Sequence, residues 1–389
     1  MRKGYNSNDF SLGGFGGFFQ SIYNNILNLI KKNPQKNNNE LIMKFNESFN
    51  DYYSNYKHKI NYYVDNPYIA KIGLINLLND CYIVSFLQIL FHTPNFLKTL
   101  KKMNMIKERE IINSLIKVSE YPFNEKYFCE LKQLFGLINP NYANPWSNDS
   151  QEFGISLIGY LISGNEEQLY DDDDEQINNF KKESDFIVAK KMAFEKYIST
   201  YYKKDNEIEK IFLFHQIDII YREKDHKPSI SSKLHLELNL LKFMDYITIE
   251  NLIDDKYNSK FDNINPKHNQ IITKRKMISI PEILIVTINR VLLNRDINDT
   301  KIIFNNILDL RNYIDYDLFN DNNKKTIYHL YAINECVHTQ RSSHYICHIK
   351  LENKWFLFDD DKKVEEEFNI GFKSFKSSFV VGLFYIREL

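Results

Sequence analysis

Residues 73–90 read GLINLLNDCYIVSFLQIL and place a lone cysteine, Cys81, where a polar pair gives way to a long apolar run. The pair, Asn79 and Asp80, is of the residue types whose side chains cap helix N-termini. The run that follows is apolar nearly all round, so we expect a buried helix. Cys81 then lies in the first turn, where the peptide dipoles favour a thiolate. Most buried cysteines are inert, so other parts of the chain must supply partners if this one is to react.

The composition narrows the class of protein. The chain has 389 residues, with 50 Lys and Arg against 51 Asp and Glu. This length suits one large domain or two ordinary ones. The balanced charge predicts no general affinity for nucleic acid or for anionic lipid. The four cysteines have no C-x-x-C spacing, which indicates neither a disulfide framework nor a zinc site. We therefore expect a protein of a reducing intracellular compartment, cytoplasm or nucleus, and not a secreted one.

The N-terminal part differs from the rest. Residues 10–32 carry Phe, Ile and Leu on one helical face, but asparagines interrupt the apolar pattern. The stretch lacks the roughly 20 apolar residues that spanning a bilayer requires, and it has no signal-peptide pattern. We expect this helix to pack on the protein's own body or on a partner. Contact of residues 10–30 with a membrane surface is the less favoured alternative.

Helical patterns dominate the first half of the chain and strand patterns the second, which predicts an α+β fold. Residues 145–162 open with Asp149 and Glu152, which are three apart and share a helix face; an acidic first turn also simply suits the helix dipole. The charge run at 166–176 is expected to be a solvated loop. Further helices are expected at 109–118, 126–138 and 186–203, and strands at 281–291, 301–310, 327–338, 344–351, 354–360 and 377–386.

A histidine and several aspartates meet in the predicted hairpin at 342–364. A tight turn at 352–353 would join its two strands. With a two-residue turn, His344 and Asp359 point to the same face within hydrogen-bonding reach. A loop one residue longer would favour Asp360, so the spacing leaves both carboxylates open. A histidine oriented by a carboxylate can act as general base for a distant cysteine, although such a pair can also be structural. His338 and His348 are the rival histidines.

Five blocks of the chain, in order, resemble the ubiquitin-specific protease family of papain-like cysteine peptidases. The Cys box GLINLLNDCYIVSFLQIL is similar to the family's GLxNLGNTCYxNSxLQxL, and the His box resembles HxGxxxxGHY followed by WxxFDDxxV. The other blocks resemble family motifs around the acidic helix start, a buried strand and the closing strand. The five are residues 73–90, SNDSQEFGISLI (147–158), IPEILIVTINRV (280–291), HTQRSSHYICHIKLENKWFLFDDDKKV (338–364) and VVGLFYIREL (380–389).

The resemblance implies a thiol-dependent deubiquitinase that hydrolyses the bond after the C-terminal glycine of ubiquitin, through a thioester. It assigns Cys81 as nucleophile, His344 as general base and Asp359 as the residue that orients the imidazole. It assigns Asn76 as the side-chain donor of the oxyanion hole. Asp360, Ser343, Asp149 and Glu152 take substrate-side positions, the last two facing the Arg-containing tail of ubiquitin. For Asp360 two roles stay open: it supports the oxyanion hole, or it simply solvates the strand end. The resemblance also implies a helical thumb carrying Cys81, a β-sheet palm carrying His344, and β fingers.

The blocks span the chain from about residue 70, so the expected domains are an N-terminal extension, 1–66, and a catalytic domain, 67–389. No cofactor is implied. The finger stretches YREKDH (221–226) and NPKHNQ (265–270) contain no cysteine, so we expect fingers without the usual zinc site. The expected partners are ubiquitin or ubiquitinated proteins; the oligomeric state stays open.

Three residues depart from the family pattern. Leu78 and Ser343 replace glycines, and Asp80 replaces a small Thr or Ser before the cysteine. A carboxylate beside the thiol disfavours the thiolate. The alternative function is therefore a catalytically weak or inactive ubiquitin-binding module of the same fold; an unrelated papain-like peptidase is a looser one.

Overall fold

The computed structural model describes the chain from residue 72 to residue 388 with gaps. The ranges are 72–77, 79–106, 109–163, 190–192, 194–195, 207–222, 225–258, 272–292, 296–319, 325–338, 343–351, 354–366 and 374–388. The predictions for residues 1–66, for the loop at 166–176 and for most of the helix at 186–203 lie outside these ranges. No helix in the described ranges is long and apolar enough to cross a membrane.

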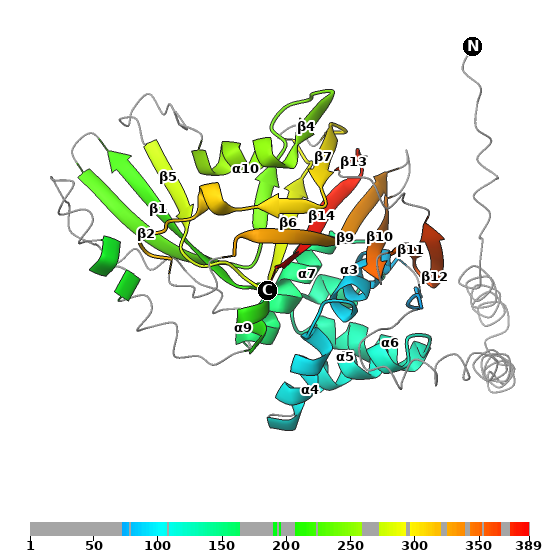
Figure 1. Cartoon of the computed structure of the whole chain (residues 1–389). Helices are drawn as coiled ribbons and strands as arrows, with labels where there is room; N and C mark the ends of the chain where they lie inside the picture. The colour runs from blue at the N-terminus through cyan, green and yellow to red at the C-terminus, as the bar shows by residue number, and fades with distance from the viewer. Residues whose placement is uncertain are drawn as a thin grey trace, which may run out of the picture. The chain divides into compact units, whose positions relative to one another are not determined.

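The chain divides into two compact units. Of the described residues, the first unit takes those from 72 to 153 together with 345–347 and 356–366, and the second takes the others. The helices at the start of the described chain are drawn from blue to cyan, and most of the strands that follow from green to red (Figure 1). This order of helices before strands confirms the predicted α+β class.

The first unit is built largely from helices. It contains α3 (Cys81–Phe91), α4 (Phe96–Ile106), α5 (Glu110–Glu120), α6 (Glu125–Phe135), the 3₁₀ helix η1 (Pro140–Ala143) and the start of α7 (Ser150–Ser163). Every residue of α3 is buried, as its all-round apolar sequence predicts. This helix is therefore the core element of its unit.

Phe153 joins several of these helices. Its ring makes edge contacts with Tyr82 of α3, Phe135 of α6 and Tyr142 of η1, at centroid distances of 5.7, 4.9 and 5.3 Å. Edge-to-face aromatic pairs at these separations stabilise beyond simple burial. Phe153, which follows Asp149 and Glu152 in the 147–158 block, therefore packs these helices together.

The second unit contains two small sheets and part of a larger one. Its elements are α9 (Glu207–Phe212), β1 (Phe214–Arg222), β2 (Asp225–Lys233), β3 (Leu236–Asn239), β4 (Tyr246–Thr248), α10 (Ile249–Asn258), β5 (Ile272–Met277), β6 (Ile283–Asn289), β7 (Lys301–Asn305), β8 (Ile307–Asp309), η3 (Arg311–Tyr313), β9 (Ile327–His338), β13 (Ser374–Ser377) and β14 (Val380–Arg387). Two small sheets have the orders β2-β1-β5 and β13-β7-β4.

The largest sheet continues through β10 (Ser343–Leu351), β11 (Lys354–Asp359) and β12 (Lys362–Glu366). Its hydrogen-bonded order is β12-β11-β10-β9-β14-β6-β3, with β8 paired to β9. Strand β6 lies between β14 and β3, and its residues Ile283–Ile288 are all buried. The continuous apolar run at 281–291 predicts this, because an interior strand covered on both faces needs no alternation.

A buried arginine holds the end of β6. Arg290 is 4% exposed, and its guanidinium donates to the carbonyl oxygens of Val380, Asn298 and Thr300 at 2.8–2.9 Å. Burial lowers its pKa to about 10. The planar donor array of Arg suits several carbonyls at once, so this residue of the 280–291 block ties the chain around 298–300 to the start of β14.

Some elements differ from the prediction. The expected strand at 301–310 is two strands, β7 and β8, which pair with different partners. Helix α10 was not predicted, although Thr248 just before it accepts a hydrogen bond from the backbone N–H of Asn251, 3.1 Å away. That capping pattern, followed by Glu250 in the first turn, is the sequence signal that could have found it.

Candidate active site

The segment before α3 is held by the turn between β11 and β12. The backbone N–H of Leu74 donates to the carbonyl oxygen of Asp360, 3.0 Å away. A Cβ atom on Gly73 would lie 2.3 Å from that oxygen and 2.3 Å from the carbonyl carbon of Asp361. Asp360 itself has a positive φ of 53°, which Asp tolerates better than most residues. The glycine that opens the Cys box is therefore required by close backbone approach.

Asn76 is fixed from both ends of its side-chain amide. Its Oδ1 accepts from the backbone N–H of Asp80 at 3.1 Å, and its Nδ2 donates to Oδ2 of Asp360 at 2.9 Å. An amide held by one acceptor bond and one donor bond has a defined orientation. Asp360 therefore positions the residue that the sequence assigns to the oxyanion hole.

Cys81 is the first residue of α3, as predicted, and is 5% exposed. The backbone N–H groups of a first helical turn have no partner within the helix and carry partial positive charge. The carbonyl oxygen of Asp80 accepts from the N–H groups of Ile83 and Val84, both at 2.9 Å. Asp80 is therefore the N-cap by its backbone.

The side chain of Asp80 does not cap this helix, which corrects the prediction from the Asn-Asp pair. It is fully buried, and its Oδ1 lies 2.5 Å from Nζ of Lys132 in α6. Asn79 does not cap either; its Nδ2 donates to the carbonyl oxygen of Pro145 at 2.9 Å. A buried carboxylate requires a partner of opposite charge, and Lys132 is that partner.

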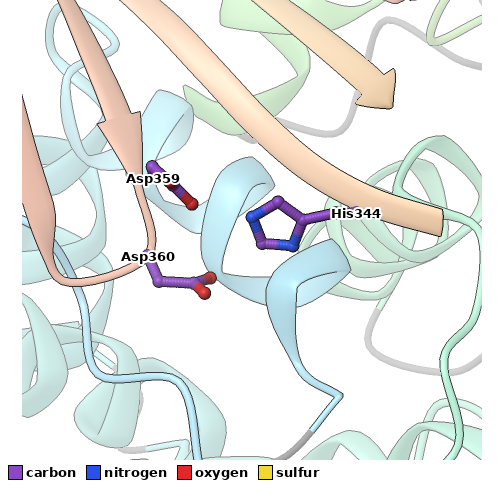
Figure 2. A group of neighbouring side chains, drawn as sticks. All are labelled: His344, Asp359 and Asp360. Carbon is purple, nitrogen blue, oxygen red and sulfur yellow. The ribbon is translucent and has the colours of Figure 1, made fainter. Parts of the chain in front are cut away.

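His344, Asp359 and Asp360 meet at the β10–β11 hairpin. Each offers one ligand-type atom, and these atoms lie within 4.8 Å of one another. Figure 2 shows both carboxylate groups pointing toward the imidazole ring. The hairpin has the predicted strands on either side of residues 352–353. Both aspartates that the sequence left open are therefore near the ring. Such a group could hold a divalent cation, and it also suits orientation of an imidazole.

The rival histidines have other partners. Nδ1 of His338 lies 2.9 Å from Oγ of Ser343, and burial lowers the pKa of His338. Nε2 of His348 lies 3.2 Å from Oε2 of Glu335, and the hydroxyl of Ser377 donates to the other carboxylate oxygen, Oε1. Of the three histidines, His344 is the one grouped with Asp359 and Asp360.

Two further cysteines are unfavourable nucleophiles. Burial raises the pKa of Cys347 well above its ordinary value, and Asp360 and Asp359 add to the effect. Burial also raises the pKa of Cys129, helped by the nearby carboxylates of Glu125 and Asp80. Since the thiolate is the reactive form, these two thiols are less suited to attack. All four cysteines are free thiols.

The predicted acidic pair lies at the start of α7. Oδ1 of Asp149 accepts from the backbone N–H groups of Gln151 and Glu152, both at 2.9 Å, so Asp149 caps the helix. Its other oxygen accepts from the hydroxyl of Tyr345 at 3.3 Å. Glu152 is exposed in the first turn. Asp149 thus has a structural role in addition to any contact with substrate.

Comparison with known proteins gives the family. The protein-family model described as ubiquitin carboxyl-terminal hydrolase matches residues 72–385 of this chain. Comparison with curated protein sequences finds no match. Among solved structures, the chain is similar to the SAGA Ubp8/Sgf11/Sus1/Sgf73 DUB module bound to ubiquitin aldehyde, with 19% identity and a TM-score of 0.57 over 82% of this chain and 70% of that one.

Two further structures are similar in the same way. The SAGA DUB module bound to monoubiquitin has 18% identity and a TM-score of 0.56, covering 82% of this chain and 69% of that one. The yeast SAGA DUB module with a mutant Sgf73 also has 18% identity and a TM-score of 0.56, covering 82% and 68%. These likenesses show the fold, and the family match spans nearly all of the described chain. The chain therefore belongs to the ubiquitin carboxyl-terminal hydrolase family, the thiol-dependent cysteine peptidases that act as deubiquitinases, and has the fold of its ubiquitin-specific protease branch.

Proposed function

We propose that this chain hydrolyses the peptide or isopeptide bond after the C-terminal glycine of ubiquitin, with Cys81 as nucleophile, His344 as base and Asp359 as its orienting group. The observation that carries the proposal is the grouping of His344 with Asp359 and Asp360 at one hairpin. It supports a general base because a carboxylate beside an imidazole fixes the ring and stabilises the imidazolium.

The proposed reaction proceeds in two steps. His344 takes the thiol proton of Cys81, and the thiolate sulfur attacks the carbonyl carbon after the terminal glycine. The tetrahedral intermediate collapses to a thioester as His344 gives its proton to the leaving amine. Water, deprotonated by His344, then attacks the thioester, which releases the ubiquitin carboxylate and restores the thiol.

Asn76 is the proposed side-chain donor to the developing oxyanion. One Nδ2 hydrogen is bonded to Asp360, and we assign the other to the oxyanion together with the backbone N–H of Cys81. Donors that are already oriented need no reorganisation as charge develops. Asp360 therefore supports the reaction by holding Asn76.

Ubiquitin is the proposed partner. The similar SAGA DUB modules were solved with ubiquitin aldehyde and with monoubiquitin. We assign Glu152, exposed at the start of α7, together with Asp149 to the Arg-containing tail of ubiquitin, because Arg–carboxylate contacts are charge-assisted. Ser343, exposed just before His344, is assigned to the path of the narrow Gly-Gly end.

The domain division and the compartment remain proposals. We propose that residues 1–66 form an extension to a catalytic domain at 67–389, which agrees with a family match that starts at residue 72. Four free thiols, one of them the proposed nucleophile, suit a reducing compartment.

One of the three grounds for the inactive-module alternative is weakened by the ion pair of Asp80. That alternative rests on three departures from the family pattern, at Leu78, Asp80 and Ser343, of which the carboxylate of Asp80 lies next to Cys81. That carboxylate is paired with Lys132, and an opposite charge at this distance offsets much of its field. An active enzyme is therefore the better-supported function.

A ubiquitin derivative with an electrophile in place of its C-terminal carboxylate tests the proposal. We expect a single covalent adduct, located by peptide mass spectrometry on Cys81. The matched control is a tail-less ubiquitin carrying no electrophile, which should give no adduct. If the electrophile leaves Cys81 unmodified, or modifies Cys129 instead, the proposed nucleophile is wrong.

Replacing Asn76 with alanine is expected to lower kcat by about 10²–10³-fold, the usual cost of losing one oxyanion donor, with KM little changed. Asn79→Ala is the matched control, because this asparagine bonds to the carbonyl oxygen of Pro145. Steady-state hydrolysis of a fluorogenic ubiquitin amide measures both. Equal kcat values for the two variants would remove Asn76 from the oxyanion hole.

A further inference from the structure

The residue before the proposed nucleophile carries a buried ion pair. Asp80 is fully buried, and Nζ of Lys132 lies 2.5 Å from its Oδ1. The side chain of Lys132 is 12% exposed. Few waters can therefore screen either group, and each charge acts on its neighbours at a low effective dielectric.

Lys132 is placed where an ammonium is favoured. It lies in the last turn of α6, where the helix carries partial negative charge. The carboxylate it meets is at the opposite kind of helix end, the N-cap of α3. Each charge is therefore stabilised by its opposite partner and by the helix end at which it lies.

The charges of this pair affect the pKa values of two neighbouring side chains. Burial is the largest cause of the raised pKa of Cys129. Of the two charges in the pair, Asp80 raises this pKa further and Lys132 lowers it. Tyr82, one residue after Cys81, has its pKa raised to about 12, mainly by burial and also by Asp80. The field of Asp80 therefore reaches side chains on both α3 and α6.

We propose that Lys132 is a positioning residue for the reaction: it neutralises Asp80 so that the start of α3 keeps a net positive field for the Cys81 thiolate. The inference rests on the proposed function of Cys81. Without the ammonium, a carboxylate on the adjacent residue would oppose the helix dipole and disfavour the thiolate.

Other titratable groups surround the pair. They are Tyr82 of α3, Tyr142 of η1, and Glu125, Cys129 and Glu130 of α6. The two glutamates add negative charge on the side of α6. A test must therefore change Asp80 and Lys132 and leave these groups in place.

The test is the rate of alkylation of Cys81 by iodoacetamide as a function of pH, followed by peptide mass spectrometry on the full chain. Lys132→Met is expected to move the midpoint of this profile up by about one pH unit and to lower the neutral-pH rate about tenfold. Lys132→Arg should keep the profile of the original chain. Lys126→Met is the matched control, because Lys126 lies in the same helix, is 78% exposed and pairs only weakly with Glu130 at 3.8 Å.

Removing the charge of Asp80 is expected to shift the midpoint of the alkylation profile in the opposite direction. Asp80→Asn, which keeps the size of the side chain, is expected to move the midpoint to lower pH, and the double variant Asp80→Asn, Lys132→Met should return close to the original midpoint. A purely structural pair would not shift the profile in opposite directions. These two variants keep the test informative if Lys132→Met does not fold.

Two results would overturn the inference: a Lys132→Met profile that moves no further than the Lys126→Met control, or single variants that shift it in the same direction. The measurement needs no ubiquitin turnover. A chain that shows the predicted shifts but does not hydrolyse ubiquitin conjugates would contradict the proposed function alone.

Discussion

Replacing Cys81 with alanine is expected to lower the hydrolysis of a fluorogenic ubiquitin amide by at least about 10⁴-fold, because alanine offers no atom that can form the thioester. Cys81 is 5% exposed at the start of α3, so removing one sulfur changes little else in the surroundings. Affinity for ubiquitin should be kept, since the remaining surface is unchanged.

Cys129→Ala is the control for this variant. Cys129 is a half-buried free thiol in α6, and the same substitution there should leave turnover near that of the original chain. Ubiquitin binding, measured by calorimetry for both variants, separates catalysis from recognition. Turnover by Cys81→Ala above a few per cent of the original rate would show that another group is the nucleophile.

Replacing His344 with alanine is expected to have an effect of similar size, about 10⁴-fold or more in kcat/KM, because residues that act as one catalytic unit fail together. The thiol would lose its base, and the leaving amine would lose its proton donor. Added imidazole should restore part of the activity by diffusing into the space left beside Asp359 and Asp360.

His329→Ala is the matched control for His344. His329 lies on β9 with a side chain that is 47% exposed, 3.7 Å from Glu388, so its loss should not alter turnover. The comparison uses the same fluorogenic substrate across pH 5–9. Near-normal turnover by His344→Ala, or loss of turnover in both variants, would contradict the role of His344 as base.

The local sequence predicts the elements of the site well. An apolar run with no polar face predicts α3, and a continuous β-branched run predicts β6, because in both cases burial on every side removes the need for alternation. The hairpin of His344 follows from two strand patterns around a short polar turn. Residue identity in family order was also enough to predict the family, which the match over residues 72–385 confirms.

The tertiary structure decided the contacts that join distant parts of the chain. Spacing left Asp359 and Asp360 as alternatives; the structure brings both near His344 and uses Asp360 also to hold Asn76, 284 residues away in sequence. The side chain of Asp80 was expected to cap α3, but it pairs with Lys132, 52 residues further on. Capping preference is local and worth about 1 kcal/mol, whereas a carboxylate that is buried must find an opposite charge.

The sequence by itself thus determined the helix that presents Cys81 and predicted this residue as the nucleophile. Only the tertiary structure decided what surrounds that thiol, because electrostatic partners are selected by burial and distance in space. Gly73 shows the same division: its place in the Cys box is visible in the sequence, while its physical reason, the close approach of the backbone at Asp360 and Asp361, exists only in the folded chain.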